Sequence, residues 1–157
     1  IVTAAHCYEG DRASSWRVRL GTSFASSGGT VYSVSRLTLH NRYSSRTLDN
    51  DIAIVRLSSA VSLSTSIRLA TIAGPNYNLA DGTAVTAIGW GALYDGGPSP
   101  EQLQHVEVFT VNQRVCEQRY AYLKTFPQYR DWPDITARML CAGILDVGGK
   151  DACQGDS

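Results

Sequence analysis

Short segments rich in β-branched and aromatic residues, separated by turn formers, are the feature that most constrains the fold of this 157-residue chain. They predict strands at residues 15–21, 30–40, 52–57, 83–91, 103–111 and 138–143. The segment LQHVEVFTV (103–111) alternates most clearly, because Val106, Val108 and Val111 stand among polar residues. Turn-forming stretches separate the strands at 25–29, 74–78 and 94–100. Many short strands with little helix indicate an antiparallel β-sandwich or β-barrel.

A single helix is expected at residues 112–123, where Asn112 can cap the first turn and Val115 and Tyr122 lie at helical spacing. The chain is long enough to bury a core. If it contains two sheet systems, we expect their boundary in the turn-rich stretch 74–82.

The charge balance excludes some classes of partner. Formal net charge is +0, from 14 basic and 14 acidic residues, so nothing favours a nucleic acid or an anionic membrane as a partner. No apolar run approaches the ~18 residues that span a bilayer. The basic residues are 12 Arg and 2 Lys. Since Arg stays charged above pH ~12 and Lys titrates near ~10.4, this bias suits an alkaline fluid. GC-rich codon usage explains it equally well.

Four cysteines, at positions 7, 116, 141 and 153, are typical of a secreted protein with disulfides. Their spacing fits no zinc motif, so we expect no metal site. Four cysteines allow three pairings, and the residues alone do not choose between them.

Three side chains are candidates for chemistry, although each has a plain structural interpretation on its own. His6 follows the small residues TAA, whereas His40 and His105 lie in predicted strands. Asp51 precedes an apolar strand, where a carboxylate needs a partner such as an imidazole N–H. Ser157 would need a base to become a nucleophile. Gly155 would let the backbone aim two N–H groups at one point.

The segments TAAHC, DNDIAIVRL, GWG (89–91) and DACQGDS together resemble the signature segments of the chymotrypsin-fold, trypsin-like serine proteases. They occur in the family's order, and the resemblance extends over the whole chain, most closely to insect digestive trypsins. It implies an all-β fold of two antiparallel six-stranded β-barrels, incomplete at both ends. Residues 1–157 would form a partial trypsin domain, with most of the first barrel in 1–73 and part of the second in 83–157.

The resemblance also implies the roles of the candidate residues. His6 would be the general base and then the general acid, Asp51 would orient it, and Ser157 would attack the scissile carbonyl. The backbone N–H groups of Gly155 and Ser157 would form the oxyanion hole. Asp151 would lie at the base of the primary specificity pocket and select Arg or Lys.

Further positions follow from the same resemblance. Ala152 adds no hydroxyl beside Asp151, which favours Arg over Lys because a point-charge ammonium needs that acceptor more than a bidentate guanidinium does. Gln154 and Leu48 belong to the substrate-binding surface, and Leu48 walls the pocket next to the primary one. Asp156 would pair with the new amino terminus after zymogen cleavage. The long segment 120–140 forms either a rim of the substrate cleft or an ordinary surface loop.

The resemblance pairs Cys116 with Cys141 and places the partners of Cys7 and Cys153 outside this sequence. We therefore expect the chain to be an internal segment of a longer enzyme. No carboxylate occurs from Arg12 through Leu48, so the calcium loop of some family members is not expected, and no cofactor is implied.

The resulting hypothesis is a secreted, monomeric, digestive endopeptidase, whose partners are proteins and peptides containing Arg or Lys and protein protease inhibitors. An alkaline gut lumen is a compatible location. The alternative is a catalytically inactive homologue that acts as a binding or cofactor protein. Such homologues usually alter the triad, and the retention of His6, Asp51 and Ser157 favours the enzyme.

Overall fold

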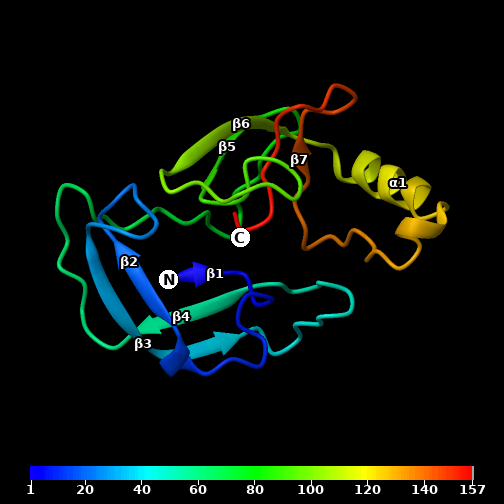
Figure 1. Ribbon diagram of the computed structural model, residues 1–157. Coiled ribbons are helices and arrows are strands. Elements are labelled where there is room, and N and C mark those ends of the chain that lie inside the picture. The colour runs from blue at the N-terminus through cyan, green and yellow to red at the C-terminus, as the bar shows by residue number, and fades with distance from the viewer. Residues whose placement is uncertain (157) are drawn as a thin grey trace.

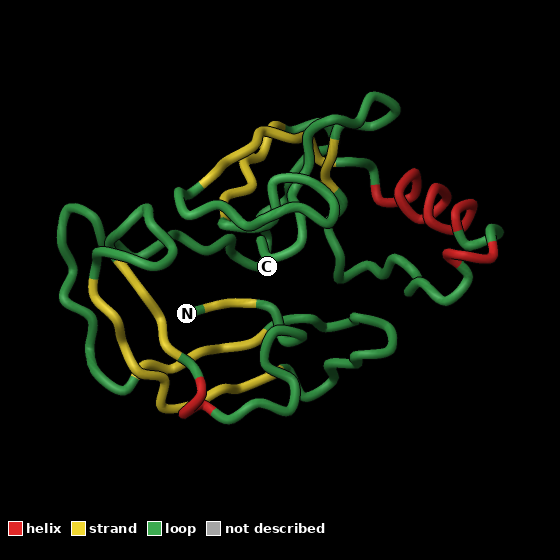
Figure 2. The backbone as a smooth tube through the Cα atoms, in the orientation of Figure 1, coloured by secondary structure: helices red, strands yellow, loops and turns green. Residues whose placement is uncertain are grey.

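The computed structural model describes residues 1–156 and shows an all-β protein with one α-helix (Figures 1 and 2). Its strands form two antiparallel sheets in two lobes, as the predicted fold class requires. The first lobe contains a four-stranded sheet in the order β1-β4-β3-β2, and the second a three-stranded sheet in the order β5-β6-β7. The strands are β1 (Val2–Thr3), β2 (Arg17–Leu20), β3 (Thr30–Leu39), β4 (Ala53–Leu57), β5 (Ala84–Gly89), β6 (Gln104–Thr110) and β7 (Ala142–Gly143).

Five predicted strands match observed ones to within three residues at each end. The prediction for 138–143 is wrong in extent, because only Ala142–Gly143 pairs with β6. The sequence analysis missed β1, since two residues are too few to show alternation. Short 3₁₀ turns, η1 (Ala13–Ser15) and η2 (Pro127–Tyr129), complete the regular structure. No helix within residues 1–156 is long and apolar enough to cross a membrane.

The core of the first lobe lies on one face of the β3–β4 ladder. Val34, Ala53 and Val55 are buried there, whereas Ile54 and Arg56 point to the opposite face. This alternation is the period of two that a half-buried strand requires. It makes β4 the strand that fills the core, and Asp51 lies two residues before its start.

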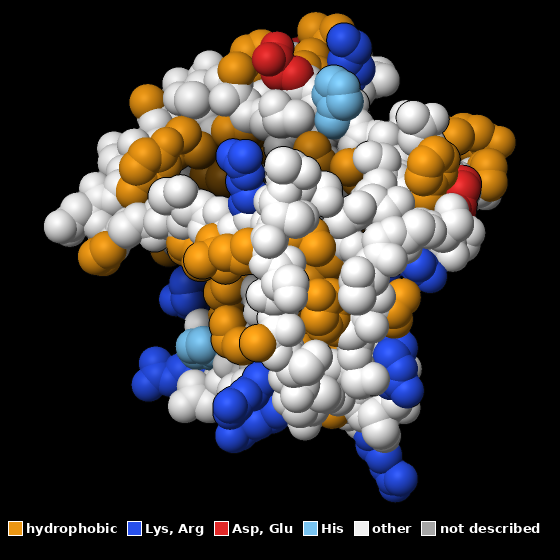
Figure 3. Space-filling model, turned by 90° about the vertical axis from the view of Figure 1, so that its left-hand side faces the viewer, with side chains coloured by type: hydrophobic (Ala, Val, Ile, Leu, Met, Phe, Trp, Pro, Cys, Tyr) orange, Lys and Arg blue, Asp and Glu red, His pale blue; other side chains and the backbone are white. Residues whose placement is uncertain are grey.

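The outer surface of the first lobe is basic. Figure 3 shows basic side chains, all of them Arg in this lobe, distributed over the lower part of the view, where the lobe lies. Arg36 and Arg56 are direct neighbours across β3 and β4, an arrangement of like charges that destabilises a sheet slightly. Nothing in the structure explains it.

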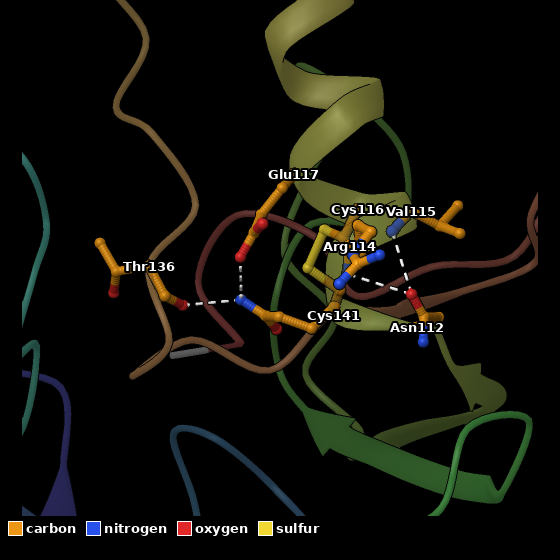
Figure 4. Close-up of a disulfide and its surroundings, with 8 residues drawn as sticks. Asn112, Arg114, Val115, Cys116, Glu117, Thr136 and Cys141 are labelled. Atoms are coloured by element: carbon orange, nitrogen blue, oxygen red, sulfur yellow. Dashed lines mark hydrogen bonds between the residues drawn. A yellow bond between two sulfur atoms is a disulfide. The ribbon is translucent and has the colours of Figure 1, made fainter.

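The helix of the second lobe, α1 (Gln113–Leu123), begins at the predicted cap. The Asn112 side chain accepts hydrogen bonds from the N–H groups of Arg114 and Val115, at 3.1 and 3.2 Å (Figure 4). The Cys116–Cys141 disulfide joins the helix to the segment that returns to β7. Closing this loop restricts the unfolded chain and stabilises the fold by about 3 kcal/mol. Helix, disulfide and returning segment therefore form one unit.

The two lobes are joined along residues 23–26 and 101–103. Leu103 N–H donates to the Ser23 carbonyl at 2.7 Å, and Ala25 N–H donates to the Glu101 carbonyl at 2.8 Å. The Glu101 carboxylate accepts hydrogen bonds from both the N–H and the hydroxyl of Ser26, which lower its pKa. Another polar contact between the lobes lies at the candidate site.

We expect Val55→Ala to destabilise the full-length protein by on the order of 2 kcal/mol, because it leaves a cavity in the core around β4. Val55 is 2% exposed, whereas Val147 is 82% exposed, so Val147→Ala serves as the matched control. Urea unfolding measures both. Equal effects of the two substitutions would contradict the assignment of the core.

Candidate functional site

The antiparallel pairing of β1 with β4 brings His6 and Asp51 together. Val2 lies opposite Ile54 and Thr3 opposite Ala53, so the chain leaving β1 and the chain entering β4 meet at the same edge of the sheet. Ala5, the residue before His6, is fully buried and anchors the turn that follows β1. Residues separated by 45 positions thus become neighbours through two pairs of a β-ladder.

Asp51 binds His6 through both of its carboxylate oxygens. Oδ2 lies 2.7 Å from Nδ1 of the imidazole, and Oδ1 accepts a hydrogen bond from the His6 backbone N–H at 2.8 Å. The two contacts fix the ring relative to its own backbone. When Nδ1 carries the proton, Nε2 is left as the basic nitrogen. Side-chain exposure is 42% for His6 and 22% for Asp51, so the pair remains open to solvent.

Nε2 of His6 lies 3.6 Å from Sγ of Cys7. Burial raises the pKa of the Cys7 thiol, and the negative charge of Asp51 raises it further. Ser157, the predicted nucleophile, lies outside the described residues.

The carboxy-terminal segment is anchored to the GWG segment through Asp156. Its carboxylate accepts hydrogen bonds from the N–H of Gly91 at 2.7 Å and from the N–H of Cys153 at 2.8 Å. A Cβ on Gly89 would lie 2.2 Å from Oδ1 of Asp156, and one on Gly91 would lie 2.5 Å from its Cγ. Only glycine fits at these two positions. Gly155 adopts a φ of +98°, in the left-handed region that favours glycine.

The residues predicted to bind substrate lie in two places. Asp151, Ala152 and Gln154 are exposed, and Oδ1 of Asp151 accepts the Ala152 N–H at 2.8 Å. Asp151 and Asp156 line a small cavity of about 100 Å³ together with Gly89 and Gly91. Asp151, the residue predicted at the base of the pocket, thus lies beside the GWG segment in the second lobe. Asp51 lies in the first lobe, just before β4.

Leu48 lies on a different cavity of about 580 Å³. Its lining also includes Trp132, Ile135 and Met139 of the second lobe, and Asp51 of the first. Residues 132–140 of the long segment therefore face the loop that leads to Asp51. Trp132 is 43% exposed and packs edge-on against Tyr129, with ring centroids 4.7 Å apart.

The candidate site also contains an ion pair between the lobes, to which no sequence pattern pointed. Oδ1 of Asp49 accepts a hydrogen bond from Nε of Arg138 at 2.7 Å, and Oδ2 accepts one from Nη2 at 2.6 Å. The Thr136 hydroxyl donates to Oδ1 at 2.9 Å. Hydrogen bonds from Arg138, and after them the one from Thr136, lower the pKa of Asp49 from 3.8 to about 2.

The sequence contained only weak signals for these additional residues. GWG was recognised as a signature segment, but its role as a seat for Asp156 depends on a contact between positions 65 residues apart. Asp49 and Arg138 are separated by 89 residues, and neither belongs to a periodic pattern that would mark it. Within residues 1–156, no group of three or more His, Cys, Asp or Glu side chains could hold a metal ion.

Comparison with known proteins identifies relatives along the entire chain. The trypsin family model matches residues 1–157. "Trypsin, alkaline B" of Manduca sexta is 52% identical over 157 residues, which are 100% of this chain and 58% of that protein. "Trypsin CFT-1" of Choristoneura fumiferana is 49% identical with the same coverage. The chain thus spans somewhat more than half the length of these relatives.

A solved structure shares the fold. The crystal structure of the scabies mite inactivated protease paralogue S-D1 superposes with a TM-score of 0.80, covers 90% of this chain and 58% of its own, and is 22% identical. At this identity the likeness is one of fold.

We expect the Asp49 ion pair to make stability depend on pH in the acid range. Because the pKa of Asp49 is lower in the folded protein than its ordinary 3.8, the contribution is complete above pH ~4 and is lost as the pH falls through about 2. Urea unfolding between pH 5 and pH 2 should show a smaller acid loss in Asp49→Asn and Arg138→Gln than in the wild type. An unchanged acid loss in both variants would contradict this assignment.

Proposed function

The chain belongs to the trypsin family, and from this premise we propose that the full-length protein is a secreted serine endopeptidase that cleaves peptide bonds after Arg, and less efficiently after Lys. The observation that carries the proposal is the pairing of His6 with Asp51 through Nδ1 at 2.7 Å. This arrangement turns an imidazole into an oriented base.

In the proposed mechanism, Asp51 holds the Nδ1 proton of His6, so that Nε2 is free to accept a proton. Nε2 takes the proton of the Ser157 hydroxyl while the oxygen attacks the scissile carbonyl. The imidazolium, stabilised by Asp51, then donates that proton to the leaving amine, and an acyl-enzyme remains. A water molecule, activated by the same nitrogen, hydrolyses the ester.

We propose that the tetrahedral intermediate is stabilised by the N–H groups of Gly155 and Ser157. The φ of +98° at Gly155 supports this role, since it directs the backbone in a way that a residue with a side chain rarely adopts. The hydrogen bonds of Asp156 to Gly91 and Cys153 hold the loop that carries these donors. In the activated enzyme, Asp156 would also receive the new amino terminus.

For specificity, we propose that Asp151 attracts the cationic side chain of the substrate. Ala152 offers no hydroxyl to assist a shorter-reaching ammonium, which favours a guanidinium able to bind in a bidentate manner. Gln154 contributes to the same surface. Leu48 and the facing residues of segment 132–140 would contact the substrate residue next to the cleaved one.

A digestive role in an alkaline fluid is the setting that we propose. Two relatives at 52% and 50% identity are named alkaline trypsins, and the predominance of Arg over Lys keeps surface charges positive at high pH. The partners would be dietary proteins and protein protease inhibitors, and the enzyme would act as a monomer. The alternative, an inactive homologue that serves as a binding protein, is disfavoured by the intact His6–Asp51 pair.

We expect Asp51→Asn to lower kcat of the activated full-length enzyme by about 10⁴-fold, because an amide stabilises the wrong imidazole tautomer. A serine-directed acylating inhibitor should abolish wild-type activity, and Ser157→Ala should prevent its incorporation. Kinetics with an Arg ester and mass spectrometry of the labelled peptide measure the two effects. Labelling of Ser157→Ala equal to that of wild type would refute Ser157 as the nucleophile.

Rates with Arg, Lys and Phe esters test the pocket. We expect kcat/KM to decrease in the order Arg, Lys, Phe, and we expect Asp151→Asn to remove most of the preference for a cation. Glu107→Gln, which removes an exposed carboxylate on β6, is the control for overall charge. A wild-type enzyme that hydrolyses the Phe ester fastest would overturn the role of Asp151, and equal Lys and Arg rates would overturn the role of Ala152.

A further inference from the structure

The turn immediately before Asp51 is strained and is held from outside the first lobe. Leu48 and Asn50, on either side of Asp49, have φ values of 52° and 56°. Positive φ is uncommon for residues other than glycine and is especially unfavourable for a bulky one such as Leu. Two such residues, one on each side of Asp49, indicate that other contacts hold this turn in place.

Contacts within the first lobe account for part of this restraint. The Ser44 N–H donates to the Asp49 carbonyl at 3.2 Å, and the Asn50 side-chain amide donates to the Arg42 carbonyl at 3.1 Å. These bonds close the loop from Arg42 to Asn50. The Asp49 carboxylate is directed toward the second lobe, which supplies its three shortest hydrogen bonds.

The second-lobe partners of Asp49 belong to a rigid unit. Thr136 donates its hydroxyl to Asp49, and its carbonyl accepts a hydrogen bond from the Gln113 side chain at 2.8 Å. Figure 4 shows the hydrogen bond that links the Thr136 carbonyl to a side chain from the first turn of α1. The Arg138 N–H donates to the Thr136 hydroxyl at 3.3 Å. The segment is therefore fixed to α1 at both ends, by Gln113 and by the disulfide.

From this arrangement we propose that Asp49 is a positioning residue for Asp51: its two-pronged bond to Arg138, supported by Thr136, locks the strained turn and so aims the Asp51 carboxylate at His6. The inference rests on the proposed function, since it assigns a role within the same His6–Asp51 pair. Arg138 contributes to both cavities that border Asp51, which places the ion pair directly beside it. The second lobe thereby controls the geometry of a pair that belongs to the first.

An ordinary surface ion pair would not carry this role, because exposed pairs contribute little. Asp49 differs in three respects. Its side chain is only 19% exposed, it receives two parallel N–H bonds from one guanidinium, and it receives a third bond from a neutral hydroxyl. Its lowered pKa has the same origin and means that the carboxylate stays ionised throughout the range in which a digestive enzyme works.

The test compares Asp49→Asn, Arg138→Gln and Asp49→Asn/Arg138→Gln in the full-length, activated protein. Glu101→Gln is the matched control, because Glu101 also connects the lobes through a carboxylate of lowered pKa but contacts Ser26 rather than the turn before Asp51. The substrate is a single-residue Arg ester, which does not extend to Leu48. We expect kcat to fall roughly 10- to 100-fold in both single variants, with KM little changed. The double variant should lose no more than the single ones.

The pH profile separates positioning from simple charge effects. Loss of the Asp49 charge by itself would move the acid limb of kcat/KM to lower pH, and loss of the Arg138 charge would move it to higher pH. If both substitutions loosen Asp51, the limb moves to lower pH in both. The low-field proton resonance of the His6 Nδ1–H, bonded to Asp51, should weaken or shift upfield in both variants and persist in Glu101→Gln.

Opposite shifts of the acid limb, or an unchanged low-field resonance with kcat within twofold of wild type, would overturn the inference. If Asp49→Asn does not fold, Arg138→Lys is the deciding variant, because it keeps the positive charge and removes the two-pronged bond to Asp49. The same measurements, kcat and the low-field resonance, then test the inference. A folded wild-type protein without any esterase activity would refute the proposed function. In that case the resonance in the variants would still show whether Asp49 positions Asp51.

Discussion

The antiparallel ladder between β1 and β4 is the interaction on which the candidate site depends. It consists of only two residue pairs. These pairs nevertheless fix the positions of the segment that follows Thr3, which carries His6, and of the segment that precedes Ala53, which carries Asp51. Because β4 is also the strand that fills the core of the first lobe, with Ala53 and Val55 almost fully buried, its position is over-determined by packing. The packing of the core therefore fixes the relative positions of His6 and Asp51.

The second lobe contributes in a different way, through two polar arrangements, one inside that lobe and one between the lobes. Asp156 is seated against two glycines of the GWG segment, which organises the chain that carries Gly155. Asp49 joins the turn before Asp51 to the unit made by α1 and the disulfide. A site divided between two lobes needs such connections, because the core of each lobe constrains only its own residues. Asp49 provides the connection between the lobes, whereas Asp156 and its donors Gly91 and Cys153 all belong to the second lobe.

Much of the fold could be predicted from local patterns, and the exceptions have physical reasons. Short β-like runs bounded by turn formers located β2 to β6, and Asn112 marked the start of α1, because these signals lie within one element. β1 and β7 are two residues long, so they exist only through their partners. Of the strand expected at 138–143, residues 138–141 are turn or irregular, because the Met139 N–H donates to the Thr136 carbonyl at 3.0 Å and closes a turn there. His6 and Asp51 were identified through motifs, whereas Asp49 and Arg138 belong to none.

The sequence by itself determined the all-β class, the single helix, the family resemblance and the identity of the residues that the proposed chemistry requires. Each of these follows from residue types at fixed local spacing, which is information that a linear chain carries. Only the tertiary structure decided that Nδ1 of His6 meets Asp51 at 2.7 Å, that Gly91 makes room for Asp156, and that Arg138 binds Asp49 across 89 residues. The first two contacts depend on how distant segments pack within one lobe, and the third depends on how the two lobes meet. No local pattern specifies either kind of placement.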